Sequence, residues 1–188
     1  MKKLFFLIFL TGCIHKQEII VEDLSFKETE LVFIKDLKEE KFSKIDIKLL
    51  NPRKRDENQR TLIYYCISYK SKSCLNALIK ANFKVNDMDV FNFSPLRFAV
   101  WTGWVEGAEV LLKNKAFVND RSYLDNPIFF EALTNKDLEI LKVLAKYRFN
   151  PNSKGFLNKK WSDFNFAKEF MTDYVNGFDE ESQSLLNF

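Results

Sequence analysis

Apolar positions return along the chain at a fixed interval of 33 residues. The positions that keep this interval are apolar core candidates and the asparagines that follow them: Leu78, Leu111 and Leu144; Ala99 and Ala132; and Asn86, Asn119 and Asn152. A period of about 20–50 residues is typical of proteins built from stacked units, each of which buries its apolar face against the next. We therefore predict one array of three units, at about residues 59–88, 89–121 and 122–154.

The start of the middle unit carries a specific motif. Ser94-Pro95-Leu96-Arg97-Phe98-Ala99, followed by Gly103, resembles the ankyrin-repeat family, whose repeats are about 33 residues long and begin with a Thr-Pro-Leu-His-like sequence. Ser94 fits a helix N-cap, and Pro95 fits the first helical position, where a missing N–H group costs nothing. The resemblance implies an all-α ankyrin-repeat solenoid of helix-turn-helix units with β-turn fingers.

Both ends of the array are predicted to be atypical repeats that act as caps. Residues 23–58 have a roughly helical apolar rhythm and resemble a degenerate first repeat. Residues 155–188 form the predicted C-terminal cap, whose segment from Ser162 to Ala167 resembles the start of a repeat. We expect its second helix to follow a longer loop around Gly177 and to close with Leu185.

The N-terminus has the pattern of a targeting segment. Residues 1–12 combine two lysines, a short apolar run and small residues, which is typical of a secretory signal peptide. Leu10-Thr11-Gly12-Cys13 resembles the bacterial lipobox, which implies cleavage before Cys13 and lipidation of its thiol. Residues 13–22 would then be a lipidated tether that anchors the chain in the bacterial cell envelope. An aspartate directly after the lipidated cysteine is associated with retention in the inner membrane of enteric-type bacteria. Because Ile14 and not aspartate follows Cys13, the outer membrane facing the periplasm is favoured if the host has two membranes.

Composition narrows the chemistry. The chain has 188 residues, of which 46% are hydrophobic and 29% charged, so it is long enough for a core and is not of the disordered class. Its net charge of +3 does not favour nucleic-acid binding. The single histidine, His15, falls in the predicted tether, and no catalytic motif accompanies it. We therefore expect a protein that is not an enzyme, with no metal, cofactor or nucleic-acid ligand.

Glycine is scarce, with five residues in the chain. Ankyrin repeats usually place glycine in the turn before the first helix, between the helices and after the second helix. We predict that Asn92 takes the first kind of position, that Gly103 takes the second, and that Asn82, Lys115 and Arg148 take the third. Asparagine tolerates the left-handed backbone conformation, whereas lysine and arginine adopt it at some cost.

Cys66 and Cys74 lie eight residues apart in one predicted repeat. The alignment of repeats places both at the contact between the two helices. An exported chain meets an oxidising compartment, in which a disulfide between them would form. Two buried free thiols that pack as small apolar residues are the alternative.

The predicted binding face follows from the resemblance, because ankyrin repeats bind proteins through their finger tips and the exposed side of the first helix. The residues that fall there are unusually apolar: Tyr69, Val90, Phe91, Phe93, Trp101, Thr102, Trp104, Tyr123 and Leu124. Exposed aromatic clusters mark interaction sites. The alternative is that Phe91 and Phe93 pack against neighbouring fingers inside the solenoid.

The resemblances together imply a membrane-anchored, exported ankyrin-repeat lipoprotein that binds a protein partner through its concave face. Small bacterial ankyrin lipoproteins often resemble immunity proteins, so the expected partner is a toxic effector that acts in the periplasm, or an envelope enzyme. The alternative is a structural scaffold for a cell-envelope protein complex.

Overall fold

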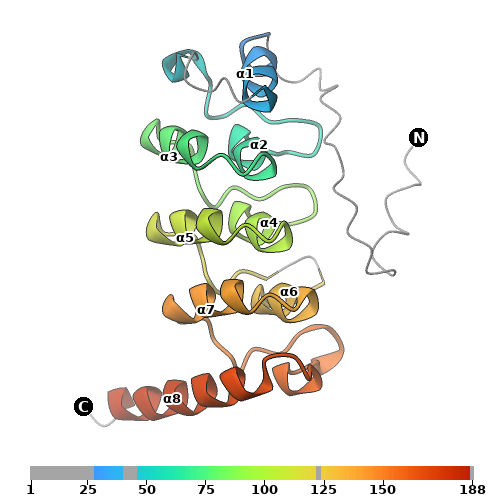
Figure 1. The fold of residues 1–188 in the computed structure, drawn as a ribbon, viewed down its shortest axis with the longest axis vertical. Coiled ribbons are helices and arrows are strands. Elements are labelled where there is room, and N and C mark those ends of the chain that lie inside the picture. Colours follow the sequence, from blue (N-terminus) through green and yellow to red (C-terminus); the bar gives the residue numbers. More distant parts are fainter. Residues whose placement is uncertain (1–27, 40–45, 122–123, 187–188) are drawn as a thin grey trace.

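The computed structural model describes residues 28–39, 46–121 and 124–186, and their helices stack as antiparallel pairs (Figure 1). The helices and helical turns are, in chain order, α1 (Glu28–Lys38), η3 (Ile47–Leu49), α2 (Leu62–Ser68), α3 (Lys72–Lys80), α4 (Pro95–Trp101), α5 (Val105–Lys113), α6 (Phe129–Asn135), α7 (Leu138–Lys146), η4 (Phe156–Asn158), η5 (Trp161–Asp163) and α8 (Lys168–Leu186). Helices α2, α4 and α6 form one column, α3, α5 and α7 form the other, and the connecting loops project beside the first column (Figure 1). This architecture confirms the all-α ankyrin solenoid.

Short polar side chains start the helices. Ser94 Oγ accepts a hydrogen bond from the backbone N–H of Arg97 at 3.1 Å, and Pro95 is the first residue of α4, as the sequence predicts. Asp137 caps α7 in the same way, accepting from Ile140 N at 2.9 Å. These caps satisfy N–H groups that have no partner within the helix.

The core runs continuously through the stack. Ala99 and Ala132 are fully buried, which lets paired helices approach closely, and Leu78, Leu111 and Leu144 are fully buried against neighbouring repeats. All five therefore occupy the positions that the 33-residue period assigns to them. Since each pair of helices covers the apolar face of the next pair, the solenoid has no separate cores.

The N-terminal cap contains one described helix before the first full repeat. In α1, Phe33, Ile34 and Leu37 are buried beside α2. Glu30 is also buried and accepts a hydrogen bond from Asn51 N at 3.3 Å, which ties α1 to the loop before α2. The described part of this cap thus contains one α-helix and the short helical turn η3.

The C-terminal cap differs from the prediction. Helix α8 runs through Gly177 to Leu186 without a loop, so the expectation of two helices around Gly177 is wrong. A Cβ atom at Gly177 would meet nothing within 4 Å, and one exposed glycine costs a helix only about 1 kcal/mol. The start of α8 is held by Met171, which is fully buried, and by Tyr174, whose hydroxyl donates to Phe149 O at 2.8 Å.

Left-handed residues also follow the 33-residue period. Apart from Leu157 and Ala167, the left-handed residues in the described part of the chain occupy three recurring turn positions: Gln59, Asn92, Asp125 and Asn158 before the first helix; Lys70, Gly103 and Lys136 between helices; and Asn82, Lys115 and Arg148 after the second helix. The five predicted positions are confirmed. The sequence analysis missed Lys70 and Lys136, although each lies 33 residues from Gly103. Lysine thus holds the turn between the helices in two of the three repeats, in a conformation that disfavours a Cβ atom.

No helix in the described part of the chain is both long and apolar enough to cross a membrane.

Candidate binding face

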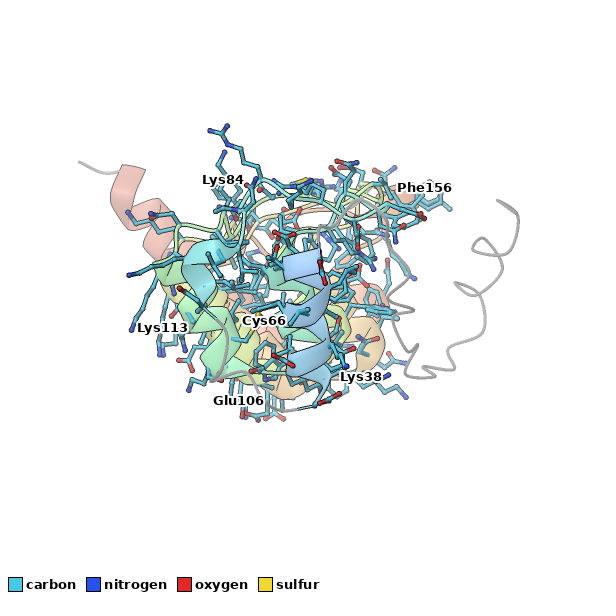
Figure 2. The ribbon with its side chains drawn as sticks, turned by 90° about the horizontal axis from the view of Figure 1, so that it is seen from above. Lys38, Cys66, Lys84, Glu106, Lys113 and Phe156 are labelled. Carbon is cyan, nitrogen blue, oxygen red and sulfur yellow. A yellow bond between two sulfur atoms is a disulfide. The ribbon has the colours of Figure 1, made fainter. Side chains whose placement is uncertain are left out.

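The loops between repeats form a layer of fingers, which we define as residues 51–60, 84–93, 117–126 and 150–160. Seen along the solenoid, this layer extends from Lys84 at one end to Phe156 at the other (Figure 2). The same backbone hydrogen bond closes the fingers whose residues are fully described. It joins Asp56 N to Arg60 O at 3.0 Å, Asp89 N to Phe93 O at 3.0 Å and Gly155 N to Lys159 O at 2.8 Å. The fingers therefore share one backbone frame and differ in their side chains.

Buried carboxylates organise the first two fingers. Asp89 Oδ1 accepts from Phe91 N at 2.9 Å and from Phe93 N at 3.0 Å, while Arg60 contacts its other oxygen at 3.0 Å. Asp56 Oδ1 accepts from Asn58 N and Arg60 N, both at 2.8 Å, and its other oxygen accepts from Tyr65. Both carboxylates are buried and hydrogen-bonded within the fingers, so they are not accessible to a partner.

A donor on the first helix ties each of these repeats to the finger that follows it. Tyr64 in α2 donates through its hydroxyl to Asp87 O at 2.7 Å and to Phe93 O at 2.5 Å. Burial raises the pKa of Tyr64 well above its usual range, so the hydroxyl remains a donor. Arg97, 33 residues later, donates through Nη2 to Asp120 O at 2.9 Å and to Asn126 O at 2.8 Å.

Arg97 is fully buried and shares its charge between two carboxylates. Its Nη1 lies 2.7 Å from Glu131 Oε1 and its Nε lies 3.5 Å from Asp120 Oδ2. Burial raises the pKa of both carboxyl groups, and the guanidinium offsets part of that effect. Ser94 Oγ donates to Asp120 at 2.5 Å and accepts from Arg97 N, which links the helix cap to this cluster. The cluster is structural, since its charges pair with one another and link the second repeat to the third.

The third repeat has no such donor. Phe130 occupies the position of Tyr64 and Arg97, and Gly155 occupies the position of Asp56 and Asp89. A Cβ atom at Gly155 would lie 2.4 Å from the Phe130 ring and 2.5 Å from Asn126 Oδ1. The ring therefore fills the space that a capping carboxylate uses in the earlier fingers.

The structure places the predicted binding residues in three groups. Val90, Phe91 and Leu124 are exposed at finger tips. Four others are half-buried: Tyr69, Phe93, Trp101 and Thr102. Trp104 is 4% exposed and belongs to the core, so its assignment to the surface is wrong. Its side chain covers Gly107 at the start of α5, where an added Cβ would lie 2.0 Å from the indole ring. Tyr123 lies outside the described residues.

Packing explains part of the aromatic series. Arg97 lies over the Phe93 ring at 5.7 Å from its centroid, and Trp101 stacks on Phe98 at 5.6 Å between centroids. The alternative of internal packing therefore applies to Phe93 and to one face of Trp101. Phe91 stays 42% exposed, and its backbone N–H is held by Asp89.

Two exposed residues were missed by the sequence analysis. Phe156 and Leu157 lie 66 residues after Val90 and Phe91, at the same two positions of the last finger. Extending the 33-residue period past the third repeat would have found them. The finger tips thus present a row of exposed apolar residues, which we call the finger-tip row: Val90, Phe91, Leu124, Phe156 and Leu157.

Asparagines tie the inner ends of the fingers together. Asn86 donates to Lys115 O at 3.1 Å and accepts from Phe117 N at 3.0 Å, and Asn119 accepts from Asn150 N at 2.7 Å. The predicted role of these side chains in satisfying backbone groups is therefore confirmed for Asn86 and Asn119. Asn152 instead donates to Asp179 Oδ1 of α8 at 3.1 Å, because no further repeat follows.

Cys66 and Cys74 are fully buried between α2 and α3, where the structure joins them by a disulfide with a Cα–Cα distance of 5.6 Å. Of the two arrangements left open by the sequence, this geometry is the bonded one. The bond staples the two helices of the first full repeat.

The site has the composition of a binding surface. Among the described residues, no group of three or more histidine, cysteine, aspartate or glutamate side chains is arranged to hold a metal ion.

Stacked helix pairs with projecting loops define the chain as a helical repeat protein. Residues 35–122 match the family model of ankyrin repeats (three copies), so this part of the chain consists of ankyrin repeats. The structure continues the same architecture through α6 and α7. No curated protein matches the chain. Ankyrin repeats imply protein–protein interaction, typically by a scaffold without enzymatic activity.

Proposed function

We propose that this chain is an exported, lipid-anchored ankyrin protein that binds a protein partner in the cell envelope through its middle fingers and first helices. The observation that carries the proposal is the set of apolar side chains exposed over these repeats, namely Val90, Phe91 and Leu124. A rigid finger layer presents them without folding on binding, which lowers the entropic cost of association.

The disulfide supports export. Disulfides persist in oxidising compartments and are rare in the cytosol. Its Cα–Cα distance of 5.6 Å lies in the ordinary range for such bonds, so oxidation needs no backbone movement. Peptide mapping of the chain isolated from its host under non-reducing conditions is expected to recover Cys66 and Cys74 in one cross-linked fragment. Free thiols at both positions would remove this support.

The lipid anchor rests on the sequence around Cys13, which lies outside the described residues. Mass analysis of the mature N-terminus is expected to show Cys13 as the first residue, carrying a diacylglycerol thioether. A Cys13→Ala variant is then expected to lose this group and to leave the membrane fraction. An N-terminus that starts elsewhere, or that carries no lipid, would contradict the anchor.

The middle fingers are tested by recovery of a partner from detergent-solubilised envelopes. A Val90→Ser/Phe91→Ser variant is expected to lose the protein that copurifies with the wild-type chain. Phe117→Ser is the matched control, because Phe117 is 63% exposed but occupies the repeat position of Lys84, at the opposite end of the finger layer from Phe156 (Figure 2). Equal recovery by the wild type and the Val90/Phe91 variant would contradict the proposed face.

For the biological role we propose immunity, in which the bound partner is a toxic effector that acts in the periplasm. Deleting the gene is expected to sensitise cells to sister cells that deliver the effector. The wild-type chain and Phe117→Ser are expected to restore protection, and the Val90→Ser/Phe91→Ser variant to fail. Normal growth of the deletion strain beside sister cells, together with loss of an envelope complex, would favour the scaffold instead.

A further inference from the structure

The last finger differs from the others in exposure and charge. Leu157 is 83% exposed and Phe156 is 53% exposed, more than any other pair of adjacent residues in the finger-tip row. This terminal finger presents an apolar tip, and the leucine holds a left-handed backbone with φ of 56°. An apolar, strained residue left this exposed points to a ligand that covers it.

The charge around the tip has one sign. Residues 154–160 contain three lysines, Lys154, Lys159 and Lys160, and no carboxylate. All three lysines are exposed, and Lys159 Nζ lies over the Phe164 ring at 4.9 Å from its centroid. The earlier fingers differ from the last one because they contain carboxylates. Asp56 and Asp89 are buried in their loops, and Asp89 pairs with Arg60.

Two carboxylates flank the tip, and each is held in place. Asp163 Oδ2 accepts from Lys160 N at 2.8 Å, and Asp125 forms an ion pair with Arg121. Arg121 also donates to Lys154 O at 2.6 Å, which braces the last finger against the preceding one. The tip is thus a firmly held loop whose outer side is apolar and basic.

We propose that the last finger docks on an anionic bilayer, with Phe156 and Leu157 in the headgroup region and the three lysines against lipid phosphates. Apolar side chains flanked by lysine are the composition of membrane-interface segments, and anionic lipid attracts clustered lysines. Charge complementarity therefore favours a lipid surface as the ligand of the last finger. This finger has no capping carboxylate because Phe130 packs against Gly155 in the space that an aspartate side chain uses in the earlier fingers. The proposed protein partner binds the middle fingers and not the last one.

Tether length allows the same membrane to hold both ends. Cys13 lies 15 residues before Glu28, a stretch that spans at most about 50 Å. Helix layers about 10 Å apart separate the first and last of the four fingers by about 30 Å. The docking proposal rests on the proposed lipid anchor in one respect only: the anchor is what brings the chain to a membrane. The affinity of the last finger for lipid is a property of residues 154–160 themselves.

The test is hydrogen–deuterium exchange of the mature chain, purified from its host and added to protein-free vesicles. One set contains phosphatidylcholine alone, and the other contains about one third phosphatidylglycerol. Exchange in residues 154–160 is expected to slow about tenfold in the anionic vesicles and little in the neutral ones. The peptide of the middle finger, 87–93, serves as the internal control and is expected to exchange equally in both.

Leu157→Asn is the sharpest variant, because asparagine tolerates the left-handed backbone and keeps the turn. It is expected to remove most of the protection, as is Lys154→Gln/Lys160→Gln, at about fivefold in docking equilibrium per lysine. Phe117→Ser is expected to retain the protection.

Mass analysis of the same samples reports the acyl group, so the docking of the last finger and the lipid anchor are tested separately. Lipidated chain with an unprotected last finger would overturn the docking and leave the anchor. Chain without lipid that sediments with anionic vesicles, and loses this in Leu157→Asn, would support the docking and overturn the anchor. Protection that appears only when a protein copurifies would overturn the docking and assign the last finger to the partner.

Discussion

The middle and last fingers share one backbone frame and are filled by opposite chemistry. In the middle repeats, a buried aspartate caps the finger and a polar side chain, Tyr64 or Arg97, bonds the carbonyls of the next finger. In the last finger, Gly155 replaces the aspartate and Phe130 replaces the donor. The closing hydrogen bond survives in both cases. The comparison teaches that this fold tolerates a polar or an apolar interior at the finger base, while the tip exposes an apolar pair in both fingers.

Removing the polar tie should have the largest effect. Arg97→Met leaves Asp120 and Glu131 without their shared cation and two carbonyls without a donor. We expect the free energy of unfolding to fall by about 3–5 kcal/mol, measured by urea denaturation. Arg97→Tyr copies the donor of the first repeat and should lose less. If Arg97→Met lowered the free energy of unfolding by no more than an ordinary surface substitution does, the hydrogen bonds and ion pairs of Arg97 would not be needed for stability.

The apolar base is tested by a matched pair of glycines. Gly155→Ala places a methyl group against the Phe130 ring and should destabilise the chain by about 1–3 kcal/mol. Gly177→Ala, in an exposed position of α8, should instead stabilise it by about 1 kcal/mol. Thermal unfolding of both variants gives the comparison. Similar shifts in the same direction would contradict the close packing at Gly155.

Turn positions that are shared by all repeats should give smaller changes. Lys115 and Arg148 hold left-handed conformations with φ of 68° and 61°. Replacing either by glycine removes the clash of Cβ, offset by the greater freedom of the unfolded chain. We expect a gain of about 0.5–1 kcal/mol for each in chemical denaturation, and a similar loss for Gly103→Ala. Destabilisation by Lys115→Gly would show that its side chain contributes more than its backbone strain removes.

The smallest effect concerns pH. Burial raises the pKa of Glu131, and Arg97 offsets part of this. A carboxyl whose folded-state pKa exceeds its unfolded value contributes most to stability at low pH, and that contribution is lost as pH rises through the raised pKa. The stability of the wild type relative to Glu131→Gln should therefore fall as the pH rises through and above the usual range for a glutamate carboxyl. A relative rise over this range would mean that the ion pair with Arg97 outweighs burial.

Much of the fold was accessible from the sequence because the repeat period is independent of local detail. The buried alanines and leucines follow from the spacing. The cap at Ser94 follows from its residue type, and the five left-handed turns follow from the spacing together with the resemblance to ankyrin repeats. The C-terminal cap was predicted, but its one continuous helix was not, because a single glycine is a weak helix breaker and its cost is outweighed by the packing of Met171 and Tyr174.

The surface was predicted less well than the core. Trp104 was assigned to the surface by its position beside Trp101, but the missing side chain of Gly107 makes a space that its indole fills. Phe156 and Leu157 were missed because the repeat motif fades after the third unit, although the period itself continues. Exposure depends on which neighbour fills which space, and sequence spacing does not report that.

The central claim is that the middle fingers contact a protein. Its most direct test is a photo-reactive phenylalanine analogue placed at Phe91 in living cells, with Phe117, which is also exposed and occupies the repeat position of Lys84, as the matched position. We expect irradiation to join the chain to one protein from position 91 and to none from position 117. An adduct from position 117 alone, or equal adducts from both positions, would contradict the claim.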